Sequence, residues 1–171
     1  MEINFNFPRP SYSTFKDLKF GDYYMYENSE SEKVFMKVMN SRGEASQLLL
    51  NTAECMGDTP TISRVTPLDV YVKGEAIYYI QESIGNYWQQ PYTTIADLQI
   101  GDCIRCLFGH SYCFGLSSAI YIIATEYGKP VSKSTCAINL KTGQLIPYQQ
   151  INFHGKVEKI LNPILKVIGK M

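Results

Sequence analysis

Four side chains that could bind a metal lie close together, as Cys103, Cys106, His110 and Cys113 in the spacing C-x2-C-x3-H-x2-C. Thiolate and imidazole groups are the ligands of tetrahedral zinc sites. In a strand, however, residues three apart point to opposite faces, so Cys103 and Cys106 could reach one metal only around a bend. We therefore expect ordinary buried or strand-edge thiols here, and no bound metal.

The sequence offers little for catalysis. It has two histidines, His110 and His154, and no serine in a GxSxG turn. Asp22 and Asp102 recur in the same short phrase, which favours a role in turns over an acid and base pair at one centre. The segment GHSYCFGLSS (109–118) lacks the GxxxxGK pattern of a phosphate-binding loop. We expect it to be a binding loop that displays His110 and Tyr112, in a protein that is not an enzyme and needs no cofactor.

That phrase belongs to an internal repeat. TFKDLKFGD (14–22) returns as TIADLQIGD (94–102), an offset of 94 − 14 = 80. Further along, VFMKVM (34–39) aligns with IYIIAT (120–125) at an offset of 86, and ASQLLL (45–50) aligns with AINLKT (137–142) at 92. Val65 and Leu68 then meet Val157 and Ile160, also at 92. The alignment puts Tyr23 and Tyr26 in place of Cys103 and Cys106, so the first copy lacks the potential metal ligands. Insertions confined to connections are typical of a duplicated fold.

The residues within each copy alternate with a period of two, which predicts strands. Val34, Met36 and Val38 would share one face, matched by Ile120, Ile122 and Ala124, while Phe35 and Lys37 share the other with Tyr121 and Ile123. The glycine and aspartate of DLxxGD predict a tight turn into a strand, and KTG (141–143) predicts a hairpin turn. About five short strands are expected per copy, at GDYYMY, VFMKV, SQLLL, near TISRV and near DVYV, which suits a small barrel. The sequence predicts an all-β protein with a first module at 1–82, a connector at 83–91 and a second module at 92–171.

Two segments lie outside the repeat, and the C-terminal end fits more than one conformation. Ile3, Phe5 and Phe7 predict an added edge strand that ends at Pro8. The connector holds Tyr87 and the only tryptophan, Trp88, which we expect to pack between the modules or to line a cleft there. At the C-terminal end, apolar residues from Val157 to Ile168 have helical spacing, but Pro163 would break one helix. We expect a final strand there, with room for a short helix from Asn162.

The composition predicts the cellular compartment and the kinds of partner of the protein. The 171 residues include five cysteines, an odd number, and MEINFNFPRP has no secretion-signal pattern, so we expect a cytoplasmic protein with free thiols. No apolar run approaches the roughly 18 residues of a membrane-spanning helix. Residues 129–171 carry seven lysines and one acid, 7 − 1 = +6, so residues 1–128 carry −6. This split could steer an anionic ligand or join copies of the chain into a homo-oligomer, although it is equally typical of uneven, solvated surfaces.

The repeated pattern resembles small uncharacterised proteins of bacteriophages and prophages. The pattern is F-x-DL-x-x-GD, an aromatic strand with a lysine, NL-x-TG before an apolar strand, and a late valine. Its carriers are Phe15, Asp17, Leu18, Gly21, Asp22, Phe35 and Lys37 in the first copy, and Asp97, Leu98, Gly101, Asp102, Asn139, Leu140, Thr142, Gly143 and Val157 in the second. The resemblance implies an SH3-like barrel module, here duplicated in tandem, in a phage-encoded accessory protein of the host cytoplasm. It implies no catalytic residues.

These observations favour a non-catalytic binding protein that captures a host protein or a small anionic ligand. The residues expected at the binding surface are aromatic or basic: Tyr87, Trp88, Tyr92, His110, Tyr112, Tyr121, Lys141 and Lys156. The first alternative is a structural or assembly component of a phage particle, which would self-associate through its acidic and basic portions. The second is a module that binds single-stranded nucleic acid, but zero net charge and the lack of a signature motif argue against it.

Overall fold

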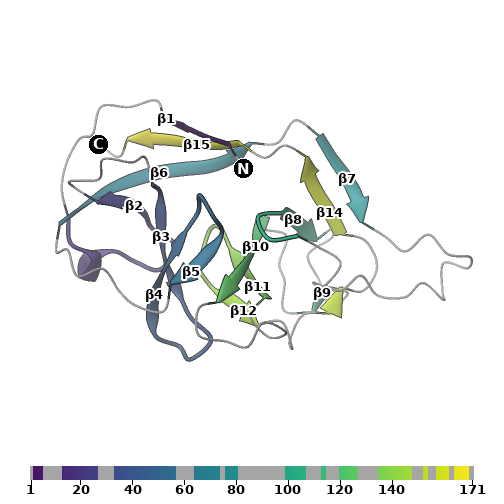
Figure 1. Ribbon diagram of the computed structural model, residues 1–171, viewed down its shortest axis with the longest axis horizontal. Helices are drawn as coiled ribbons and strands as arrows, with labels where there is room; N and C mark the ends of the chain where they lie inside the picture. Colours follow the sequence, from purple (N-terminus) through teal and green to yellow (C-terminus); the bar gives the residue numbers. More distant parts are fainter. Residues whose placement is uncertain are drawn as a thin grey trace, which may run out of the picture.

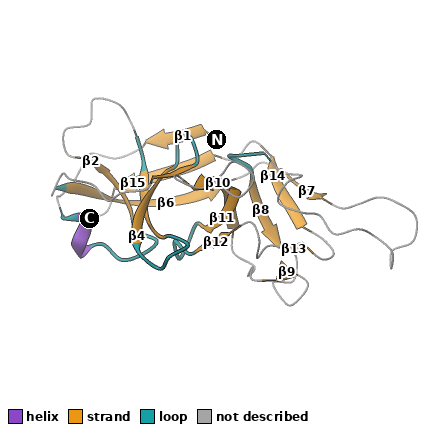
Figure 2. Ribbon diagram, turned by 60° about the horizontal axis from the view of Figure 1, so that its bottom comes forward, coloured by secondary structure: helices purple, strands orange, loops and turns teal. Residues whose placement is uncertain are grey.

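The computed structural model describes residues 2–5, 13–26, 33–56, 64–73, 76–80, 99–106, 113–114, 120–126, 135–147, 152–153, 157–161 and 164–169. Within these residues the chain is all-β, as predicted, except for one short 3-10 helix, η1 (Phe15–Asp17), which is purple in Figure 2. In the same part of the chain, no helix has the length and apolar character needed to cross a lipid bilayer.

The strands follow one another in two series. The first series is β1 (Glu2–Phe5), β2 (Tyr23–Tyr26), β3 (Phe35–Met39), β4 (Ala45–Leu49), β5 (Glu54–Met56), β6 (Val65–Lys73) and β7 (Ala76–Ile80). The second series is β8 (Cys103–Cys106), β9 (Cys113–Phe114), β10 (Ile120–Glu126), β11 (Thr135–Asn139), β12 (Leu145–Pro147), β13 (Asn152–Phe153), β14 (Val157–Leu161) and β15 (Ile164–Gly169).

Among the described residues, thirteen strands form one sheet (Figure 1), in the order β1-β15-β6-β2-β3-β4-β5-β10-β8-β14-β7, with β11 joined to β10 and β12 joined to β11. The strands β9 and β13 form a separate two-stranded sheet. Within the large sheet, the order β6-β2-β3-β4-β5 returns as β14-β8-β10-β11-β12. We call these two sets the first repeat and the second repeat. The internal repeat seen in the sequence is thus reproduced in the strand pairing.

The pairing register confirms most of the sequence alignment. Tyr23 faces Met36 and Leu68, and Cys103 faces Ile122 and Ile160, which confirms the offsets of 80, 86 and 92.

The offset predicted for β4 and β11 is wrong by two residues. Met36 faces Leu48, whereas its equivalent Ile122 faces Ile138, so the offset is 138 − 48 = 90 and not 92. A slip of two residues keeps each side chain on its original face, so the hydrophobic pattern could not detect it.

Two strand predictions are also corrected. Separate strands were expected near 61–65 and 69–72, but Val65 and residues 69–72 belong to the single strand β6. The remaining strand of the first repeat is β5, at Glu54–Met56, which was not predicted because three residues are too few to show a period.

The short helix expected from Asn162 is wrong. Residues Ile164–Gly169 form the strand β15. Six residues of β15 pair with β6, and four of these also pair with β1, so sheet formation prevails over the helical spacing of the apolar residues. The predicted N-terminal strand is confirmed at Glu2–Phe5, at one end of the sheet order.

The principal hydrophobic core contains residues from both repeats. The predicted inward faces are confirmed, since Met36 and Val38 from β3 share one cluster with Ile122 and Ala124 from β10. The cluster continues into the neighbouring strands and turns through Tyr23, Met25, Val34, Leu48, Leu50, Ala53, Cys55, Leu68, Cys103, Cys136, Ile138, Leu140 and Leu145. The core is therefore common to the two repeats.

Candidate partner-binding surface

The two DLxxGD turns have the same geometry. Gly21 and Gly101 have φ values of 93° and 96°, which a residue with a side chain adopts only with strain. Asp22 accepts a hydrogen bond from the backbone N–H of Lys19 at 2.8 Å, and Asp102 accepts one from Gln99 at 2.8 Å. Both aspartates therefore have the structural role in turns that the sequence predicted.

The turn at Gly21 lies directly against the second repeat. A Cβ added to Gly21 would lie 2.4 Å from the carbonyl oxygen of Lys141, and one added to Gly143 would lie 2.6 Å from the nitrogen of Gly21. The Tyr23 hydroxyl donates to the Leu140 carbonyl in the same region. Only glycine fits at both positions, so the hairpin turn Lys141–Gly143 and the Gly21 turn are packed backbone to backbone.

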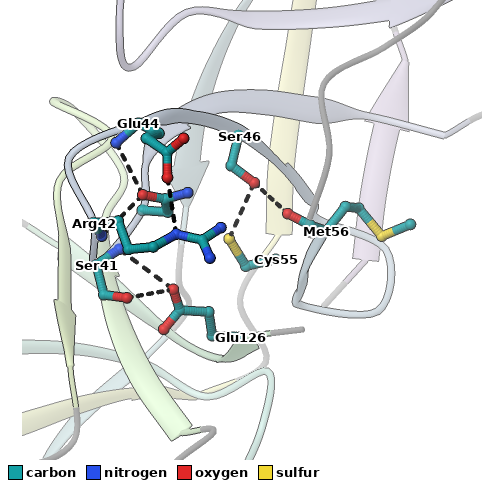
Figure 3. Close-up of polar contacts among 8 residues, drawn as sticks. Ser41, Arg42, Glu44, Ser46, Cys55, Met56 and Glu126 are labelled. Atoms are coloured by element: carbon teal, nitrogen blue, oxygen red, sulfur yellow. Dashed lines mark hydrogen bonds and ion pairs between the residues drawn. The ribbon is translucent and has the colours of Figure 1, made fainter. Parts of the chain in front are cut away.

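A second contact joins the repeats through β10 and β5, which pair in parallel. Thr125 donates its backbone N–H to the Ala53 carbonyl at 3.0 Å. The buried Glu126 accepts hydrogen bonds from Ser41, at 2.7 Å from the hydroxyl and 3.3 Å from the backbone N–H (Figure 3). At this contact, no described atom lies within 4 Å of a Cβ placed on Gly101, so packing is looser than at Gly21.

Three large apolar side chains are exposed among the described residues: Phe20 at 39%, Met39 at 38% and Ile100 at 41% of their surface. Phe20 and Ile100 are equivalent, since both precede the glycine of DLxxGD. Met39 donates its backbone N–H to the Gly143 carbonyl at 3.0 Å, so Met39 and Phe20 both lie beside the hairpin turn Lys141–Gly143. Lys141, also exposed, belongs to that turn. We call Phe20, Met39 and Lys141 the interface surface.

The backbone beneath the interface surface is held in place by a buried lysine. Lys37, in β3, is only 8% exposed, and its ammonium donates to the carbonyls of Phe15 at 3.0 Å and Leu18 at 2.8 Å. It also lies over the rings of Phe15 and Phe20, at 4.7 and 5.6 Å from their centroids. Burial lowers the pKa of Lys37, against the opposing effect of Asp22 and Asp17. These contacts of the Lys37 ammonium hold η1 and the segment up to Phe20 against the sheet.

An aromatic cluster covers the opposite face of β2 and β3 from the shared core. Tyr24 and Phe35 stack with their centroids 5.5 Å apart, and Phe15 meets Tyr24 edge-on at 5.6 Å. Tyr24 and Tyr26 both donate to the side-chain oxygen of Gln47 at 2.7 Å. These rings pack with one another and with the sheet, so we assign them a structural role.

Three thiols lie in environments that disfavour the thiolate form. Cys55, Cys103 and Cys136 are free and buried. Burial raises the pKa of Cys55 to about 11 and that of Cys103 to about 12, and it also raises the pKa of Cys136. A nucleophilic cysteine needs a lowered pKa and access to solvent, and these three have neither.

The predicted zinc ligands can be followed only in part. Cys103 faces the shared core. Cys106 lies at the other end of β8 and Cys113 in the separate sheet, while His110 lies outside the described residues. In the part of the chain that the structure describes, no group of three potential metal ligands comes together.

The structure describes two of the predicted binding residues. Lys141 is exposed and belongs to the interface surface. Tyr121 is buried in β10, where its hydroxyl accepts a hydrogen bond from the Asn139 side chain at 3.3 Å. The other six predicted residues lie outside the described residues: Tyr87, Trp88, Tyr92, His110, Tyr112 and Lys156.

Sequence reasoning missed Phe20 and Met39. A signal for Phe20 was present, because both copies place a large apolar residue just before the turn glycine, where turns usually carry polar residues.

Comparisons with protein-family models, with curated proteins and with solved structures find no match to this chain.

Proposed function

We propose that this chain is a non-catalytic binding protein that captures a host protein through the interface surface. The observation that carries the proposal is the exposure of Phe20 and Met39 beside Lys141 on a rigid frame. Large apolar side chains that stay exposed on fixed backbone lose little entropy when a partner covers them, and such positions are often anchors of protein interfaces. Lys141, together with the exposed Lys19, suits a partner segment that carries acidic residues.

The described polar groups support binding over catalysis. Asp22 and Asp102 are engaged in turns, and Lys37 is bound to backbone carbonyls. The second repeat lacks an equivalent interface surface, because it has Thr125 where the first has Met39, and Asn51 takes the place of Lys141 beside its turn. We therefore assign binding to the first repeat's DLxxGD turn.

The fold-level part of the proposal rests on the resemblance and on the strand order. Each repeat is an SH3-like module in which the fifth strand pairs with the first, and the order β6-β2-β3-β4-β5 supports this. The DLxxGD resemblance supports a phage-encoded accessory protein that acts in the host cytoplasm.

The test is affinity capture from host cell extract with immobilised protein, followed by mass spectrometry. Wild-type protein should retain one partner in stoichiometric amount, and the double variant Phe20→Ser, Met39→Ser should lose it. Lys141→Glu should weaken capture at least about tenfold, since it places an acid against an acidic segment.

The matched control is Ile100→Ser, which makes the same kind of change at the equivalent turn of the second repeat. It should leave capture unchanged. If no stoichiometric partner is retained, or if the double variant captures as well as wild type, the proposal is wrong.

A further inference from the structure

The two contacts between the repeats are equivalent to each other. Met39 in the first repeat donates its N–H to Gly143 in the second, and Thr125 in the second donates its N–H to Ala53 in the first, both at 3.0 Å. Met39 corresponds to Thr125 at an offset of 86, and Ala53 corresponds to Gly143 at 90. Exchanging the two repeats therefore turns each contact into the other, which is the property of a two-fold axis.

The equivalence extends to backbone conformation. Gly143 has a φ of 73°, and Ala53 at the corresponding position has a φ of 55°, although it carries a side chain. Met39 forms a parallel bridge with Gln144, and its counterpart Thr125 pairs in parallel with Glu54. The same local structure thus occurs at both contacts between the repeats.

The strands after β6 and β14 are exchanged between the repeats. The strand β7 follows β6 of the first repeat but pairs with β14 of the second, over Ala76–Ile80. The strand β15 follows β14 of the second repeat but pairs with β6 of the first, over Ile164–Gly169. Figure 1 shows β15 along β6 at one end of the molecule and β7 beside β14 at the other. The strand that follows each repeat in the sequence therefore pairs with the other repeat.

The shared core has the same symmetry. Twelve of its seventeen buried members form equivalent pairs from the two repeats: Tyr23 and Cys103, Met36 and Ile122, Val38 and Ala124, Leu48 and Ile138, Leu50 and Leu140, and Cys55 and Leu145. Each repeat thus presents the same apolar face to the other. Separating them would expose that face to water on both sides.

We infer that the surface between the repeats is an isologous interface, of the kind that two copies of one chain form around a two-fold axis. The partner that fits each repeat is a copy of the same repeat, supplied here within one chain. The protein is a covalently linked pseudo-dimer with exchanged strands, and not a pair of independent modules on a connector.

The test cuts the full chain between the repeats. A protease site is inserted after Gly85, in the predicted connector, and cleavage is verified by denaturing electrophoresis. Native mass spectrometry should then find both fragments in one complex with the mass of the uncut chain. Two separate folded fragments would overturn the inference.

Two glycine variants locate the interface in the cut protein. Gly21→Ala and Gly101→Ala impose the same backbone strain, but only the first places a methyl group against Lys141 of the other repeat. The dissociation constant of the two fragments should rise at least about tenfold more for Gly21→Ala than for Gly101→Ala. Equal effects would contradict the assigned interface.

Hydrogen exchange on the uncut wild-type chain provides a test that needs no variant. Amides of β3 and β10 should open with equilibrium constants that agree within about threefold and should respond equally to denaturant, because the shared core opens as one unit. Two separate classes of opening, one for each repeat, would overturn the inference.

Discussion

At the level of single residues, Lys37 is a buried lysine whose ammonium donates to backbone carbonyls. The strand that contains Lys37 is otherwise apolar. The Lys37 ammonium donates to the carbonyl oxygens of Phe15 and Leu18 in place of water. Carbonyls left without a donor inside a protein are costly. Lys37 thus closes η1 in the way that a capping residue closes a longer helix.

The variant Lys37→Ala should lower the free energy of unfolding by about 1–3 kcal/mol, because the Leu18 carbonyl loses its ammonium donor and the Phe15 carbonyl keeps only the backbone N–H of Leu18. Urea unfolding followed by circular dichroism measures the change. The control is Lys16→Ala, whose exposed side chain should matter by less than about 0.5 kcal/mol. Equal effects of the two variants would show that Lys37 does not close η1.

The buried thiols predict how stability depends on pH. Burial raises the pKa of Cys55 from 9.0 to about 11, so the folded state holds a proton that the unfolded state releases above about pH 9. Cys103 and Cys136 act in the same direction. The stability that these thiols contribute is present below pH 9 and is lost as the pH rises from about 9 to 11.

Urea midpoints measured at pH 8 and pH 10 should therefore differ, with the lower midpoint at pH 10. Cys55→Ala should be less stable than wild type at both values because of the lost packing, but its midpoint should fall less between them. If its midpoint falls as far as that of wild type, Cys55 does not contribute to the pH dependence.

At the level of elements, local patterns predicted several strands of each repeat. Alternation identified β3 and β10 and their inward faces, and glycine with aspartate identified both turns. The same reasoning placed β11 two residues away from its true register, because alternating patterns are unchanged by a slip of two. It also missed β5, which has only three residues.

The strand β15 shows the opposite limit. Its apolar residues have a spacing that fits a helix, and what decides its conformation is the pairing with β6, a strand that lies almost a hundred residues earlier in the sequence. No local pattern contains that information.

Replacing Val167 with proline should show how much β15 contributes. Proline removes a backbone donor from the register in which Val167 faces both Phe5 and Val70. Hydrogen exchange at β1 and β6 should accelerate at least about tenfold, with a smaller change at β14. Unchanged exchange at β1 would show that β15 does not hold it in place.

At the level of the whole molecule, the interface surface could not be predicted from sequence. Phe20 and Lys141 are 141 − 20 = 121 positions apart, and they come close only because the two repeats pack around one core. Sequence reasoning did identify Lys141, for its charge, and the repeat that brings it to Phe20. It could not identify the contact, because the glycine pair Gly21 and Gly143 acquires its meaning only from the arrangement of the repeats.

The pairing of β1 with β15 also sets the order in which the sheet can be completed during protein synthesis. Glu2 pairs with Ile164, which the ribosome adds 164 − 2 = 162 residues later. At about 5–20 residues per second, β1 waits roughly 10–30 s for its partner. During that time the first repeat has left the ribosome with β6 still lacking its neighbour, and unpaired strand edges promote aggregation. A strand that is made early in synthesis is therefore paired late, and the edge of β6 that β15 covers is exposed during that interval.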